Sequence, residues 1–151
     1  MNREELQSAI TALNADITFE EGGEYLTANI PADACRDIMQ ALHNLPAFEM
    51  DYMFCLTCVD WKTHLTMVYH LESRKHAHAV VIKSKLDREN PEIETLSDIW
   101  RTAEFLEREV YDLFGVRFIH HPDLRRLLLT DDWEGYPLRK DYEDPINMIK
   151  L

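Results

Sequence analysis

The stretch Glu107–Tyr142, EREVYDLFGVRFIHHPDLRRLLLTDDWEGYPLRKDY, begins with the pattern of an amphipathic helix and ends with no helical or strand period. Apolar residues in steps of four and three predict one buried helix face, at Ile99, Ala103, Leu106, Val110 and Leu113. Thr95 to Asp98 match a helix start signal, and Gly115 suits a left-handed stop. Glu104, Arg108 and Asp112 are spaced by four, which predicts ion pairs along another face.

Beyond Gly115 the sequence is dense in large and specific side chains, which is unusual in a free tail. They are His120, His121, Pro122, Arg125, Arg126, Trp133, Tyr136, Pro137, Arg139 and Tyr142. An extended segment cannot satisfy its own backbone groups, so it must lie along its own domain or along another protein of the same assembly. Because arginine and large aromatic residues anchor protein contacts, we favour wrapping of a partner, and an arm folded back on its own sheet is the alternative.

The remaining chain predicts an α+β fold in two layers. The expected elements are a helix over 4–13, strands over 17–21 and 25–30 around Gly22-Gly23, a helix from Pro31 to 45, strands over 53–61, 65–71 and 77–83, a polar surface loop over 87–94 and the helix that ends at Gly115. Short polar connections favour antiparallel neighbours among the last three strands.

The order is therefore α-β-β-α-β-β-β-α-arm. It predicts a mixed sheet of about five strands with helices on one face and an extended C-terminal arm. We expect a compact domain over residues 1–115 and define residues 116–151 as the C-terminal arm, which packs on the domain or on a partner protein.

Composition limits the partners that the chain can have. Its 151 residues suit one domain, and a net charge of −12 disfavours nucleic acid and anionic membranes as partners. No apolar run is long enough to span a bilayer. The N-terminal sequence lacks the basic start and apolar run of a signal peptide, and three cysteines suit reduced thiols, so we expect an intracellular protein.

Candidate metal and cofactor motifs are sparse. Cys55 and Cys58 are three apart on a predicted strand, so their thiols point to opposite faces and cannot share an ion. His76 and His78 share a face and could form a two-ligand site, as in a small stand-alone metal-dependent hydrolase, although no third ligand is evident. Four glycines without a Gly-rich phosphate loop give no support for NADH or flavin binding.

The acidic cluster on the helix has three interpretations. Glu107, Glu109 and Asp112, with Arg108 among them, suit a salt-bridged helix face. A charged docking face for a partner is the second interpretation. Catalytic acid–base use is the weakest, because no nucleophile or metal accompanies the carboxylates.

Three motifs together resemble a known family. They are Glu107-Arg108-Glu109-x-x-Asp112-Leu113-Phe114-Gly115, then His121-Pro122-Asp123-Leu124-Arg125-Arg126, then Asp132-Trp133-Glu134-Gly135-Tyr136-Pro137-Leu138-Arg139-Lys140-Asp141-Tyr142. They resemble the 30-kilodalton subunit of respiratory complex I, known in bacteria as the C subunit, and the resemblance covers roughly residues 50 to 142. Phe105 stands where that family often has Trp, and His120 stands where it often has Gly.

The resemblance implies a scaffold subunit of a proton-translocating NADH:quinone oxidoreductase. Such a protein belongs to the peripheral arm of the complex, on the cytoplasmic side of the plasma membrane, and packs against the larger subunit that contributes to the quinone pocket. It carries no redox centre, because FMN, iron–sulfur clusters and quinone belong to other subunits. Related membrane-bound hydrogenases and ferredoxin- or quinone-linked complexes contain equivalent subunits, and a soluble adaptor outside any redox complex is a further alternative.

On this interpretation a set of residues serves the partner interface or positions the arm, and none is catalytic. The set is Glu107, Arg108, Glu109, Asp112, His121, Pro122, Arg125, Arg126, Trp133, Gly135, Tyr136, Arg139 and Lys140.

Overall fold

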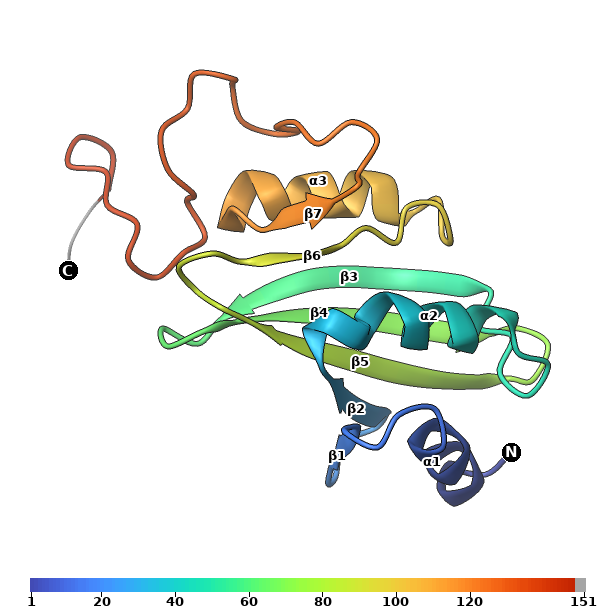
Figure 1. Cartoon of the computed structure of the whole chain (residues 1–151). Helices are drawn as coiled ribbons and strands as arrows, with labels where there is room; N and C mark the ends of the chain where they lie inside the picture. The colour runs from blue at the N-terminus through green and yellow to red at the C-terminus, as the bar shows by residue number, and fades with distance from the viewer. Residues whose placement is uncertain (149–151) are drawn as a thin grey trace.

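The computed structural model describes residues 1–148 and places three helices against one face of a five-stranded sheet (Figure 1). In chain order its elements are α1 (Arg3–Thr11), β1 (Thr18–Glu20), β2 (Leu26–Ile30), a 3-10 turn (Ala32–Ala34), α2 (Cys35–Asn44), β3 (Tyr52–Asp60), β4 (Leu65–Ser73), β5 (His78–Leu86), β6 (Glu92–Glu94), α3 (Ala103–Phe114) and β7 (Arg117–Ile119). The predicted α+β class and element order are confirmed, while the last three residues of the C-terminal arm lie outside the described residues.

The sheet is mixed, with the strand order β1-β2-β5-β4-β3. Strands β3, β4 and β5 form an antiparallel meander, as their short connections predict. Strands β1 and β2 form the predicted hairpin, in which Gly22 and Gly23 both take left-handed φ values of 80° and 79°. Strand β2 joins the meander parallel to β5, because α2 and two further strands separate them in the chain.

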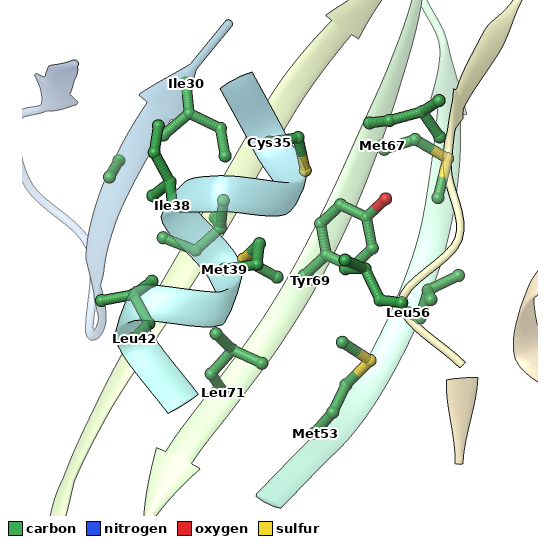
Figure 2. Close-up of a cluster of buried hydrophobic side chains, with 14 of the residues drawn as sticks. Ile30, Cys35, Ile38, Met39, Leu42, Met53, Leu56, Met67, Tyr69 and Leu71 are labelled. Carbon is green, nitrogen blue, oxygen red and sulfur yellow. The ribbon is translucent and has the colours of Figure 1, made fainter. Parts of the chain in front are cut away.

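One hydrophobic core lies between the sheet and the helices. Alternate residues of β4, including Met67, Tyr69 and Leu71, are fully buried, as the period of a strand requires. Figure 2 shows α2 crossing the sheet with Met39 and Leu42 directed at this face. The same core includes apolar residues of α1 and α3, so a single core supports the whole described domain.

Both later helices begin further along the chain than the start signals predict. Pro31 is extended (φ −67°, ψ 140°) and precedes the 3-10 turn, so α2 begins at Cys35. The start signal at Thr95 is wrong, since α3 begins at Ala103 and Ile99 lies outside it. The backbone N–H of Thr95 instead donates to the Ile119 carbonyl at 2.9 Å, which holds this segment beside β7.

A second, two-stranded sheet was not predicted. Strand β6 lies within the segment expected to be a surface loop, and β7 lies at the start of the C-terminal arm; the two pair in parallel. Their central residues, Ile93 and Phe118, are both buried to 2% exposure. Strands of three residues are too short for a period of two to be recognised in the sequence.

Candidate functional site

The C-terminal arm is the candidate functional site, and it begins with β7. Residues 120–148 then continue without helix or strand. Figure 1 shows this segment looping away from α3 and returning toward the end of β3. Two buried carboxylates, Asp112 of α3 and Asp60 of β3, hold it to the domain.

Asp112 is the first anchor. Its Oδ2 accepts from three successive backbone N–H groups, those of Leu127, Leu128 and Leu129, at 3.2, 2.7 and 3.0 Å. Its Oδ1 accepts from Nη1 of Arg126 at 3.0 Å. Burial alone would raise the pKa of Asp112, but these donors together lower it. The carboxylate is therefore charged, and both of its oxygens accept hydrogen bonds from the arm. The four-residue spacing on α3 therefore does not produce the expected Arg108–Asp112 ion pair within residues 1–148.

Two arginines close the loop that Asp112 anchors. Buried Arg108 donates from Nε and Nη2 to the carbonyls of Arg125 and Arg126 at 3.2 and 3.0 Å. Arg126 donates from Nη2 to the carbonyls of Trp133 and Gly135, both at 3.0 Å. These guanidinium groups satisfy carbonyls that an extended segment would otherwise leave without donors.

Tyr136 packs against the end of α3. Its ring lies so close to Gly115 that a Cβ there would be 2.6 Å from Cε2, and Gly115 has the predicted left-handed φ of 78°. The guanidinium carbons of Arg126 and Arg139 lie 5.2 and 5.8 Å from the ring centroid, within cation–π range. Arg139 also donates from Nε to the Phe114 carbonyl at 2.6 Å, where a cation suits the negative end of the helix dipole.

Asp60 is the second anchor, and sequence reasoning missed it. Its Oδ2 accepts from the backbone N–H of Lys140 at 2.8 Å, and its Oδ1 accepts from the N–H of Lys62 at 2.7 Å and from Arg88. The Arg88 guanidinium holds the pKa of Asp60 well below its usual range. Arg88 also pairs with Asp141 at 3.2 Å. The only sequence signal was a carboxylate at a strand end, which says nothing about contacts 80 residues away.

Glu107 is the third buried acid. Its carboxylate accepts from Thr95 Oγ1 at 2.6 Å and from the Leu96 N–H at 2.7 Å, and burial raises its pKa to about 7. The nearest histidine nitrogen, Nε2 of His121, is 3.8 Å away. His121 Nε2 donates to the Glu104 carbonyl at 2.9 Å and Nδ1 accepts from the Asp123 N–H, an arrangement that fits a neutral ring.

The other predicted site residues are partly or fully exposed. Glu109 is partly buried on α3, whereas Pro122 and Lys140 are exposed. Arg125 pairs with Asp123 at 3.0 Å, and its side chain is 65% exposed. Trp133 is 36% exposed.

The described residues contain no grouping of three or more metal-ligating His, Cys, Asp or Glu side chains. His76 and His78 do stack, with ring centroids 5.4 Å apart. His76 Nε2 hydrogen-bonds to Glu49 and lies 2.9 Å from the Pro46 carbonyl. Cys35, Cys55 and Cys58 are free thiols. Between residues 1 and 148, no helix has the length and apolar character that crossing a membrane requires.

Half of the exposed large hydrophobic side chains in the described residues belong to the arm. They are Leu128, Trp133, Leu138, Ile146 and Met148, with exposures of 64%, 36%, 53%, 90% and 45%. The arm is thus held to the domain by buried polar contacts and directs apolar side chains to its outer surface. A surface of this kind is typical of a protein-docking segment.

The fold and the anchored arm define a small α+β protein with a long structured extension. The chain belongs to the family described as "Respiratory-chain NADH dehydrogenase, 30 Kd subunit", which matches residues 28–146. The sequence resemblance is therefore confirmed, and the matched region includes nearly all of the described arm.

Curated relatives agree with this family. The chain is 47% identical over 124 residues to the NADH-quinone oxidoreductase C/D subunit of Phocaeicola vulgatus, a match that covers 81% of this chain and 24% of that protein. It is 37% identical over 144 residues to the NADH-quinone oxidoreductase C subunit of Chlorobium phaeobacteroides, covering 93% of this chain and 84% of that one. The chain thus spans about a quarter of the C/D protein and most of the separate C protein.

Two solved structures share the fold. One, with a TM-score of 0.78 and 28% identity, covers 95% of this chain and 86% of that one, and comes from the membrane-bound sulfane sulfur reductase, an archaeal respiratory membrane complex. The other is the trypsin-resistant fragment of Nqo5, with a TM-score of 0.69 and 27% identity, covering 82% of this chain and all of that fragment.

Proposed function

We propose that this chain is a non-redox scaffold subunit in the peripheral arm of a proton-translocating NADH:quinone oxidoreductase, where it docks on the larger quinone-site subunit. The exposed apolar side chains of the C-terminal arm carry this proposal. Family membership indicates the kind of complex, and the arm supplies a surface for a neighbour.

The arm is suited to docking because it is already ordered. Asp112, Asp60 and Arg108 fix its backbone at residues 125–129 and 140, so binding a partner does not require ordering of that part of the chain. A segment that is ordered before association loses less conformational entropy on binding. We propose that residues 116–148 bind a partner protein on their outer side while their inner side packs on the domain.

The identity of the partner is supported by the relatives whose names carry the letters C/D. Those names describe one polypeptide that combines the C and D subunits, and this chain matches about a quarter of it. Two functions joined in one polypeptide are commonly neighbours in one assembly. We propose that the larger of the two, the D subunit, is the partner. We also propose that the chain lies on the cytoplasmic side of the plasma membrane, and that other subunits hold FMN, iron–sulfur clusters and quinone.

Co-purification with the larger subunit tests the proposal. The tagged wild-type chain should retain the larger subunit. Leu128→Ser and Ile146→Ser should each retain less, because these arm side chains are 64% and 90% exposed and contribute little to the fold. Leu45→Ser, which changes a 42% exposed leucine at the end of α2, is the matched control and should behave like wild type. A wild-type chain that retains no larger subunit would refute the docking role.

The equivalent subunit of another respiratory membrane complex is the second candidate. The similarity to a chain of the sulfane sulfur reductase complex, with the higher of the two TM-scores, favours it. A competition experiment separates the two candidate functions. In it, the chain is offered the larger subunit of an NADH:quinone oxidoreductase together with the equivalent subunit of the other respiratory membrane complex. We expect preferential retention of the NADH-linked subunit.

A further inference from the structure

The charges of the arm are distributed in a way that its sequence does not suggest. The sequence predicts that arginines of this segment contact a partner, but Arg126 and Arg139 are directed inward. The Arg126 side chain is 12% exposed and pairs with Asp112, and Arg139 donates to the Phe114 and Arg88 carbonyls. These two cations are therefore used within the chain.

The outer side of the arm forms a hollow of about 410 Å³ between residues 130–134 and 142–147. Its apolar lining includes Trp133, Tyr142, Pro145 and Ile146. Its acidic lining includes Asp132, Glu134 and Asp144, and within residues 1–148 no lysine or arginine lines it. The hydrogen bonds and ion pairs found in the described residues do not involve the carboxylates of Asp132 or Glu134, so both are available to a ligand.

We infer that this hollow, the arm groove, receives a basic side chain, arginine or lysine, from an apolar segment of the larger subunit. The argument is charge complementarity. A cation would be attracted by Asp132 and Glu134, and its stem or guanidinium plane could pack on the Trp133 or Tyr142 ring. Apolar neighbours of that cation would cover Ile146, which is 90% exposed.

A second copy of this chain is a poor occupant. It would bring a net charge of −12 to the groove, and like charges repel across an interface. The inference rests on the proposed function and deepens it, because it gives the chemistry of the surface that the larger subunit presents.

The test is the salt dependence of binding between the full-length chain and the purified larger subunit. The groove variant is Asp132→Lys with Glu134→Lys. The matched control is Glu21→Lys with Glu24→Lys, which makes the same charge change at exposed positions of the β1–β2 hairpin. Wild-type affinity should fall as salt is added, since salt screens charge attraction. The groove variant should bind at least about tenfold more weakly at low salt, and the control should bind like wild type.

A second variant guards against damage to the arm by lysine. Asp132→Asn with Glu134→Gln keeps the side-chain size, and it should flatten the salt dependence while leaving the melting temperature unchanged. If wild type binds and both groove variants bind equally well, the inference is overturned and the proposed function stands. If wild type does not bind the larger subunit, both fail. A wild-type dimer that is lost in the groove variants would make a second copy the occupant and would also overturn the inference.

Discussion

Replacing Glu107 with Gln should change the free energy of unfolding in a pH-dependent way. The difference in this free energy, variant minus wild type, should rise as the pH goes from acidic to neutral. Glu107 is fully buried, and burial raises its pKa from 4.5 to about 7. Gln can keep the same contacts, because its oxygen can accept from the Leu96 N–H and its amide can donate to Thr95 Oγ1. The variant therefore removes the ionisation and preserves the packing.

The sign follows from proton binding. Between pH 4.5 and pH 7 the folded protein holds a proton on Glu107 that the unfolded chain releases, so wild-type stability falls as pH rises through this range. A pKa difference of this size corresponds to roughly 3 kcal/mol, of which about 2 kcal/mol falls between pH 5.5 and pH 8. The stability of Glu107→Gln relative to wild type should therefore increase by about 2 kcal/mol between pH 5.5 and pH 8.

Chemical denaturation of wild type and variant at pH 5.5, 6.5, 7.5 and 8 measures the difference. Taking the difference cancels the titration of other groups, provided that they behave alike in both proteins. Glu109→Gln, on the same helix but outside this hydrogen-bonded network, is the control for the loss of one carboxylate from α3. A Glu107→Gln difference that does not change with pH would refute the reasoning that burial dominates this carboxylate.

Three further substitutions test the arm anchors. Asp112→Ala should destabilise the chain by roughly 2–4 kcal/mol and speed proteolysis near Leu128, because it leaves three backbone N–H groups without their acceptor and the Arg126 guanidinium without its counter-charge. Gly115→Ala should lower stability by at least about 1 kcal/mol in thermal unfolding, since a Cβ meets Tyr136 and the left-handed φ is strained. Arg139→Glu should lower the melting temperature, because Arg139 donates to the end of α3; an unchanged melting temperature would show that this contact is not stabilising.

The central sheet was predictable because its signals are local. Strands β3, β4 and β5 are each nine residues long, and short polar links join them, so alternation and connection length determine the meander. The hairpin at Gly22 and the end of α3 at Gly115 were predictable for the same reason, since each depends on a left-handed glycine.

Polar contacts between residues far apart in the chain could not be predicted from the sequence. Thr95 matches a helix start signal. In the folded protein, however, its hydroxyl donates to the carboxylate of Glu107, 12 residues further along the chain, and the Leu96 N–H donates to the same carboxylate. Asp60 and Lys140 meet across 80 residues. A sequence pattern reports spacing along one element, whereas these contacts depend on how separate elements pack.

The direction of the arm side chains was the least predictable feature of the candidate site. Arg126 and Trp133 look alike in sequence as docking residues, yet Arg126 binds Asp112 while Trp133 is 36% exposed. The difference arises because Asp112 lies beside residues 126–129 of the arm, and only the folded structure shows that placement.

Amide hydrogen exchange of the full-length chain, alone and with the larger quinone-site subunit, tests the central claim most directly. The exposed outer segments at residues 130–134 and 142–148 should become slower to exchange in the complex, while the amides of Leu127, Leu128 and Leu129, already bonded to Asp112, should change little. Exchange that is identical in both samples across the whole arm would contradict the claim that this arm is the docking surface.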